Sequence, residues 1–293
     1  MNLINFKNLI KYSIASVFVE PYEKNGYYCP VNLLLIAPAE CGKTRLLDGI
    51  LCKKTYETLD LSPKVIQEKL IPKIQAGEIS FLVIADLIQL LGHKKITSNT
   101  TIHFLNAIIE EGIQNNDFYG LEFHLDKKID CGLLVGVTTE KFFENLKEWN
   151  AIGFLHRIIP ISYNYSKETI LKIHNEISSG EMFRDINKID LGERKKRIKI
   201  KIPKKYANDI QLIVMRIVNR FSNFKIKKRI GSKDEWIYFD IKGFRLHDRL
   251  RQIARAICFL DSKGKRKEVN SSDILKLEGL EEIINLPNTQ KWM

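Results

Sequence analysis

The sequence predicts an α/β protein built on a doubly wound parallel sheet, followed by a mostly helical C-terminal part. Apolar runs that are too continuous for half-exposed strands recur through the first 165 residues, as in parallel strands covered on both faces. Segments with helical spacing separate these runs, which is the order expected of a parallel sheet with crossover helices. At 293 residues the chain is long enough for one large core and a smaller second lobe.

The expected elements divide the chain into two parts. Five strands are expected at residues 31–36, 56–59, 79–85, 132–137 and 159–161. The helices between them are expected at residues 43–52, 64–70, 101–111 and 140–149, and a β-hairpin at residues 112–130. Further helices are expected at residues 166–178, 206–222, 244–261 and 271–284. We therefore expect an α/β domain over residues 1–165 and a helical domain over residues 166–293, with a basic, irregular or extended insertion around residues 180–240.

Composition indicates the compartment and the kind of partner. The formal net charge of +12 and the isoelectric point near 9.3 exceed what solubility requires, and they favour a polyanionic partner, most simply nucleic acid. A membrane surface is the weaker interpretation, and a Lys- and Ile-rich composition can also reflect an AT-rich genome. No uninterrupted apolar run of about 18 residues is present. The five cysteines include no Cys-x-x-Cys pair. We therefore expect a cytoplasmic protein with reduced thiols and no membrane contact.

A phosphate-binding loop is predicted directly after the first apolar strand. The sequence Gly42-Lys43-Thr44 ends a tight loop and begins a helix. In such a loop, backbone N–H groups face the phosphates of ATP, the lysine reaches their outer oxygens and the threonine hydroxyl ligates Mg²⁺. Ala37 stands where the strict motif has a glycine, at a position that does not need a positive φ. The residues expected to bind the nucleotide are Ala37, Pro38, Ala39, Glu40, Cys41, Gly42, Lys43, Thr44 and Arg45.

Asp86 is the expected Walker B residue, which holds Mg²⁺ through water. It ends the buried strand predicted at residues 79–85, and the next position, where most such ATPases carry the glutamate that activates water, is Leu87. Without a positioned base, hydrolysis can lose a factor of about 10²–10⁴. We therefore expect a slow ATPase or a nucleotide switch unless another carboxylate serves. The candidates for that role are Glu40, Glu110 and Glu111.

A sensor residue is expected at the tip of the strand predicted at residues 132–137. Thr138 or Thr139 would face the γ-phosphate there and orient the attacking water. A threonine at this point can also cap the following helix, and Thr139 fits that role better. Thr138 is therefore the predicted sensor.

The order of these features resembles that of the AAA+ ATPases. The resemblance rests on the phosphate loop, Asp86, the hairpin, Thr138, Arg157 and the segment that begins Phe244-Arg245-Leu246-His247-Asp248-Arg249. Within the family the chain looks most like the minichromosome-maintenance helicase motor and the AAA+ ATPases of phages and mobile elements. The resemblance covers most of residues 15–165 and, for the helical lid, about residues 240–275; residues 180–240 have no recognised counterpart.

The resemblance implies roles for two arginines. Arg157, just ahead of the fifth strand, matches the arginine finger that enters the nucleotide site of a neighbouring subunit and stabilises transition-state charge. Arg245 matches the sensor 2 arginine of the lid, which touches phosphate, and Arg249 is the reserve assignment. The resemblance therefore also implies a homo-oligomer, a ring or filament for which a hexamer is expected.

Basic segments supply the expected contact with DNA. Residues 194–202 alternate basic residues with isoleucines, so a strand there would bury one face and present cations on the other; residues 225–229 are similar. Such contacts would reach phosphates independently of base sequence. A solvated edge strand is the alternative. The hairpin at residues 112–130 lies where helicase motors carry a DNA-touching hairpin, and an ordinary surface hairpin fits it equally well.

These features together predict an ATP-dependent motor that acts on DNA, in replication or replication initiation of a virus, plasmid or other mobile element. One alternative is a nucleotide switch that loads or regulates another replication protein. The others are a nucleic-acid-binding module with vestigial ATP chemistry and a small-molecule kinase. The expected finger argues against a kinase, because kinases close arginines from a lid of their own chain.

Overall fold

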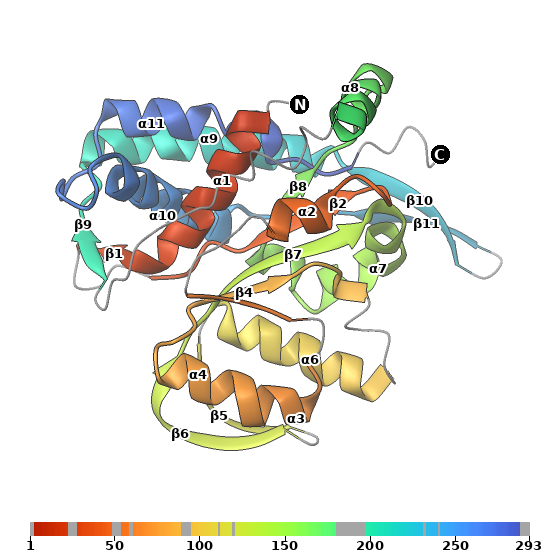
Figure 1. Ribbon diagram of the computed structural model, residues 1–293, viewed down its shortest axis with the longest axis horizontal. Coiled ribbons are helices and arrows are strands. Elements are labelled where there is room, and N and C mark those ends of the chain that lie inside the picture. Colours follow the sequence, from red (N-terminus) through yellow and green to blue (C-terminus); the bar gives the residue numbers. More distant parts are fainter. Residues whose placement is uncertain are drawn as a thin grey trace.

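A five-stranded parallel sheet forms the centre of the computed structural model (Figure 1), which describes residues 3–22, 28–48, 54–58, 61–88, 95–110, 112–118, 121–179, 197–230, 233–239 and 241–287. Its strands are β2 (Leu33–Ala37), β3 (Thr55–Glu57), β4 (Phe81–Ile84), β7 (Gly132–Thr138) and β8 (Ile159–Ser162). They lie in the order β3-β4-β7-β2-β8, and each neighbouring pair is parallel. The predicted α/β class and parallel sheet are confirmed.

The sheet order brings three strand ends together. β7 lies between β2 and β4, and the register pairs Ala37 with Thr138 and Ile84 with Val135. The carboxyl ends of β2, β4 and β7 therefore lie side by side, and we call this end of the sheet its carboxyl edge. Ligands of open α/β sheets usually bind there. The helices α2 (Lys43–Asp48) and α7 (Thr139–Ala151) begin directly after β2's loop and β7.

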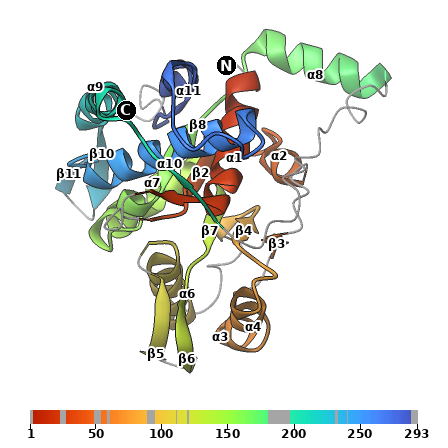
Figure 2. The ribbon, with the colours of Figure 1, turned by 90° about the vertical axis from the view of Figure 1, so that its left-hand side faces the viewer.

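A lower lobe hangs below the sheet in Figures 1 and 2. It contains the helical stretch α3 (Pro63–Val65), η2 (Ile66–Leu70) and α4 (Ile71–Gln75), the helix α6 (Lys95–Ile108), and the hairpin of β5 (Ile113–Phe118) and β6 (Leu121–Ile129). The predicted hairpin is confirmed. The helix expected at residues 64–70 continues to Gln75 through a π-helical turn. Pro72 explains an irregularity at this point, because it has no N–H to continue the α-helical ladder.

Both ends of the described chain join one helical group. Its helices are α1 (Leu3–Ala15), α9 (Lys204–Ser222), α10 (Phe244–Asp261) and α11 (Ser271–Glu278), with the short turns η1 (Ser16–Phe18) and η4 (Glu281–Ile283). The strands β1 (Val19–Pro21) and β9 (Ile198–Ile200) pair in parallel and tie the two ends together. α1 packs against α10 (Figure 1). The domain boundary at residue 165 remains a prediction.

Two elements leave this body. The helix α8 (Lys167–Ser179) projects away from it in both Figures 1 and 2. β10 (Lys225–Ile230) and β11 (Lys233–Tyr238) pair as a separate antiparallel hairpin at the right of Figure 1, in the segment that the sequence analysis left as irregular or extended. We call this hairpin the β10–β11 ribbon.

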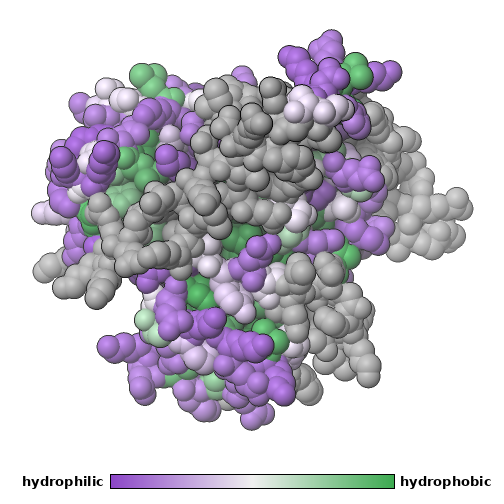
Figure 3. Space-filling model, viewed as in Figure 1, coloured by the Kyte–Doolittle hydropathy of each residue, from purple (hydrophilic) through white to green (hydrophobic). Residues whose placement is uncertain are grey.

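The described residues on the face in Figure 3 are mainly hydrophilic. In Figure 3 purple predominates over the lower lobe and the projecting α8, with small green areas between. No helix in the described ranges is both long and apolar enough to span a membrane.

Candidate functional site

The predicted phosphate loop lies at the carboxyl edge of the sheet. Ala37 is the last residue of β2, so it has extended backbone, as expected for a position that needs no positive φ. The loop then turns through left-handed conformations at Glu40 (φ 60°) and Gly42 (φ 69°). A Cβ at Gly42 would be strained at that φ, which explains the glycine directly before Lys43.

Lys43 begins α2 directly after this loop. Its Nζ donates hydrogen bonds to the carbonyl oxygens of Ala37 (3.0 Å) and Pro38 (2.8 Å). Burial lowers the pKa of Lys43 below its usual range, and the nearby Cys41, Asp86 and Glu140 oppose that shift. Asp86 and Glu140, which follow two other strands, therefore act electrostatically on Lys43. The sequence analysis expected a carboxylate beside the loop at Asp86 and did not expect one at Glu140.

Asp86 follows β4 at the same edge. Its Oδ1 accepts a hydrogen bond from the Ile88 N–H at 2.9 Å, which holds the carboxylate in a short turn. Gly136 of β7 permits this arrangement, because a Cβ there would lie 2.4 Å from the Ala85 carbonyl oxygen. Leu87 is fully buried, so its side chain belongs to the core and not to the loop.

The threonine that caps α7 is Thr138, whereas we expected Thr139 to cap it. Thr138 is the N-cap of α7, and its Oγ1 accepts a hydrogen bond from the Lys141 N–H at 3.4 Å. Thr139 is buried in the first turn instead. The expectation that Thr139 caps the helix was wrong, because α7 begins at Thr139, one residue earlier than predicted. Thr138 as a sensor remains a prediction.

Two tyrosines that the sequence analysis did not single out support the loop from beneath. The Tyr163 hydroxyl donates to the Cys41 carbonyl oxygen at 3.2 Å, and the Tyr165 hydroxyl would lie 3.6 Å from a Cβ at Gly42. Burial raises the pKa of both hydroxyls and of the Cys41 thiol. These groups are therefore neutral at pH 7 and add no negative charge beside the phosphate loop. Their signal in the sequence was the pair of aromatics directly after the fifth strand.

Glu110 lies at the opposite edge of the sheet and binds two arginines. Its carboxylate forms ion pairs with the Nε atoms of Arg157 and Arg245, and its side chain is only 6% exposed. Arg157 also donates from Nη1 to the Gly153 carbonyl oxygen at 2.9 Å. Arg245 comes from the start of α10, so this cluster joins the sheet to the helical group.

Asn32 positions this cluster relative to β2. It is fully buried, and its Nδ2 donates to the carbonyl oxygens of Ile109 (3.0 Å) and Arg157 (3.2 Å). Its Oδ1 accepts from the Leu133 N–H at 2.9 Å. Asn32 precedes the strand that leads to the phosphate loop, and a strand of that length spans roughly 15 Å. Glu110 and Arg245 therefore lie far from the phosphate loop of their own chain.

This geometry corrects one expectation and qualifies another. Glu110 does not reach the loop as a substitute base, and Glu111 lies outside the described residues. Arg245 contacts Glu110 and not the phosphate loop, so the arrangement does not bring it to a nucleotide of its own chain. Arg249, the reserve, is buried and donates to the His156 carbonyl oxygen at 3.4 Å.

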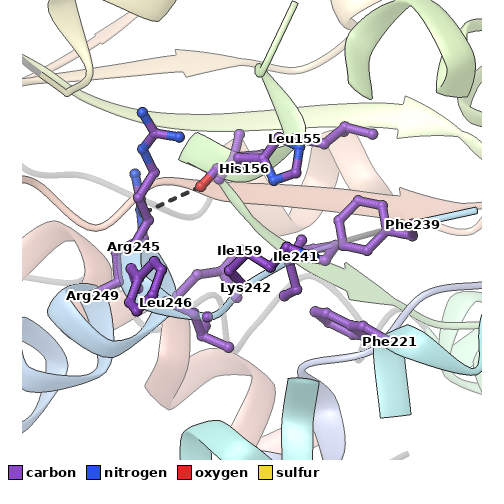
Figure 4. A pocket seen from close by; sticks show the side chains of 14 residues that line it. Leu155, His156, Ile159, Phe221, Phe239, Ile241, Lys242, Arg245, Leu246 and Arg249 are labelled. Carbon is purple, nitrogen blue, oxygen red and sulfur yellow. Dashed lines mark hydrogen bonds between the residues drawn. The ribbon is translucent and has the colours of Figure 1, made fainter. Parts of the chain in front are cut away.

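A pocket of about 350 Å³ opens beside the arginines. Figure 4 shows Arg245 and Arg249 at one end and Phe221 and Phe239 at the other, with the backbone of η3 (Leu155–Arg157) along one side. Phe244, on the rim, is 80% exposed. The pocket was not predicted, because its walls come from segments far apart in the sequence.

The expected DNA-binding segments differ in what they present. In 197–202 the alternation is confirmed: Ile200 and Ile202 are buried, whereas Lys199 and Lys201 are exposed. Arg197 forms an ion pair with Asp130 at 2.6 Å, and Lys201 one with Glu268 at 3.3 Å. Residues 194–196 lie outside the described ranges. The exposed positions of β6 include Glu122 and Asp126 as well as Lys127 and Lys128, so the described side chains of this strand form no continuous basic face.

Comparison with known proteins adds no assignment. No protein-family model matches the sequence, and no curated protein matches it significantly.

Proposed function

We propose that this chain is a P-loop ATPase of the AAA+ type that binds Mg²⁺ and ATP and acts on DNA as a homo-oligomer. The observation that carries the proposal is the setting of Lys43. It begins α2 directly after a loop with left-handed residues that follows a buried parallel strand, and Asp86 and Glu140 act on it electrostatically. A lysine, two carboxylates and a threonine hydroxyl at one sheet edge suit a magnesium–nucleotide complex.

The residues at this edge fit the nucleotide in a specific way. Lys43 Nζ now donates to two loop carbonyls, so a phosphate would offer it a charged acceptor in their place. Thr44 and Asp86 are the residues that would hold Mg²⁺. When bound, Mg²⁺ neutralises charge that develops on the phosphates.

Glu140 is the carboxylate that we propose as the base in place of Leu87. It is exposed in the first turn of α7, directly after the strand end that carries Thr138. Among the carboxylates considered, it and Asp86 act on Lys43, whereas Glu110 belongs to the opposite edge. Glu140 would accept the proton of the attacking water.

Arg157 and Arg245 support a role between subunits. Both side chains form ion pairs with Glu110 at the edge opposite the phosphate loop, and we infer that they serve a nucleotide held by a neighbour. The exposed Phe244 beside Arg245 favours the same interpretation, because exposed aromatics next to arginines are typical of interfaces. We propose that Arg157 acts as the finger and that Arg245 accompanies it. The C-terminal helices would then act as the lid of one subunit against the next, and replication or its initiation is the proposed role.

A nucleotide switch is the second candidate. The buried Leu87 favours it, because this position supplies no carboxylate. As a switch the protein would bind ATP and change its assembly without turnover.

One experiment separates these candidates. ATP hydrolysis is measured with and without single- and double-stranded DNA, together with the mass in solution with a non-hydrolysable analogue. The motor predicts DNA-stimulated turnover and an analogue-dependent oligomer, whereas the switch predicts the oligomer without turnover. Failure to bind ATP would overturn both.

A further inference from the structure

The β10–β11 ribbon presents aromatic and basic residues on the same face. Its register pairs Ile226 with Ile237, and both are buried, which fixes one face inward. Lys225 pairs with Tyr238, and Trp236 lies two residues before Tyr238, so these three side chains occupy the outward face. Trp236 is 42% and Tyr238 55% exposed.

The base of the ribbon is anchored on both sides. Phe224 stacks on Phe143 of α7 with ring centroids 6.4 Å apart, and Phe239 packs edge-to-face on Phe221 of α9 at 5.4 Å. Asn150 Nδ2 donates to the Tyr238 carbonyl oxygen at 3.5 Å. The ribbon is therefore a supported platform, and its outward aromatics do not serve to attach it.

The charge of the ribbon favours a polyanion. Residues 225–238 carry five basic and two acidic side chains, a net charge of +3. Lys225 Nζ lies 5.3 Å from the centre of the Trp236 ring, so a cation already flanks the exposed aromatic. Cations that follow a backbone and aromatics that receive bases are the combination found in single-strand binding surfaces.

The spacing of the two aromatics favours unpaired bases. Trp236 and Tyr238 lie two residues apart on one face, which corresponds to about 6.7 Å along a strand. Bases stacked within one strand rise about 3.4 Å, so neighbouring bases must unstack to lie on both rings. A duplex cannot offer such bases without opening.

We propose that the β10–β11 ribbon binds single-stranded DNA, with Trp236 and Tyr238 stacking on successive bases and Lys225 contacting phosphate. The choice of DNA rests on the proposed function. The stacking itself requires no nucleotide and involves none of the residues of the phosphate loop.

The test measures binding of fluorescent oligodeoxythymidine of about 30 nucleotides, longer than an ordinary single-strand site, and of a duplex of the same length, without ATP. Trp236→Ala and Tyr238→Ala should each weaken single-strand binding about 5- to 100-fold, the value of one stacked base. Trp236→Phe keeps a ring and should bind within about threefold of the wild type. Tyr22→Ala is the matched control, because Tyr22 is 58% exposed and lies outside the ribbon.

The salt dependence separates stacking from charge. Trp236→Ala should leave the slope of log affinity against log salt unchanged, whereas Lys225→Gln should make it shallower by about 0.7, the value of one phosphate contact on a single strand. Wild-type affinity in both aromatic variants, or equal losses on single strands and duplex, would overturn the ribbon proposal. Lys43→Ala should bind single strands normally. If the wild type did not bind ATP, the proposed ATPase function would fail and the ribbon proposal would not. If Trp236→Ala kept DNA-stimulated turnover and the wild-type affinity for single-stranded DNA, only the ribbon proposal would fail.

Discussion

Glu110 and Arg157 form an ion pair that joins two segments 47 positions apart at the start of β8. Asn32 secures the backbone next to both partners, because its amide binds the carbonyl oxygens of Ile109 and Arg157. A side chain held this firmly within its own chain can turn outward only if Glu110 releases it. The ion pair therefore holds the Arg157 side chain in a defined position, at the end of the sheet where we propose that a neighbouring subunit binds.

The first prediction concerns Arg157 itself. Arg157→Ala should keep ATP binding and lose about 10³-fold or more of turnover, the range reported for finger arginines. Mixing it with Lys43→Ala protein should restore part of the activity, because mixed interfaces combine an intact loop with an intact arginine. Activity equal to the sum of the separate proteins would assign Arg157 a structural role.

The second prediction concerns the phosphate loop. Lys43→Ala should abolish most ATP binding measured by titration calorimetry, with little loss of stability, because the hydrogen bonds that the structure describes for the Lys43 side chain go to the Ala37 and Pro38 carbonyl oxygens and to no buried side chain. Asp86→Ala should instead reduce the Mg²⁺ dependence of binding or turnover. Normal ATP affinity in Lys43→Ala would contradict the nucleotide site as a whole.

The third prediction tests Glu140 as the base. Glu140→Gln should reduce turnover about 10²- to 10⁴-fold while ATP still binds. Glu148→Gln, at an exposed position of the same helix, is the matched control and should leave turnover unchanged. Leu87→Glu is a poor test of the missing glutamate, because it would bury a carboxylate in the core. If Glu140→Gln turns over normally, the base lies elsewhere.

The fourth prediction concerns Asn32. Asn32→Ala should lower the free energy of unfolding by about 3 kcal/mol, since it leaves buried backbone groups without partners. Asn106→Ala should cost less, about 1 kcal/mol, because a single hydrogen bond to the Ile152 carbonyl oxygen is lost. Guanidinium melts of the two variants measure the difference. Equal losses of unfolding free energy would show that the hydrogen bonds of Asn32 do not hold the cluster to β2 as we describe.

The fifth prediction is a pH dependence of stability. Burial raises the pKa of the Cys29 thiol from 9.0 to about 11. Between these values the unfolded chain loses the thiol proton first, so the free energy of unfolding should fall as the pH rises from 9.0 towards 11. Cys29→Ala should make this decline shallower, and guanidinium melts across the window test it. An identical slope in the variant would show that Cys29 does not contribute.

The sequence by itself determined the parallel sheet, the loop between β2 and α2 and the hairpin at residues 112–130. Continuous apolar runs and the Gly42-Lys43-Thr44 motif are local signals, because each can be read within a short window of the sequence. Element ends were less certain. The helix α7 begins at Thr139 instead of residue 140, which places the N-cap at Thr138 instead of Thr139.

Only the tertiary structure decided which side chains meet. Strand order brought Glu140 within the field of Lys43 and set Glu110 at the other edge, although Glu110 lies nearer in sequence to Asp86. The same holds for Arg245, which reaches Glu110 from α10, and for the ribbon face, which depends on the pairing of β10 with β11. These contacts join segments that are far apart in the sequence. No local pattern predicts them, because they depend on how whole helices and strands pack against one another.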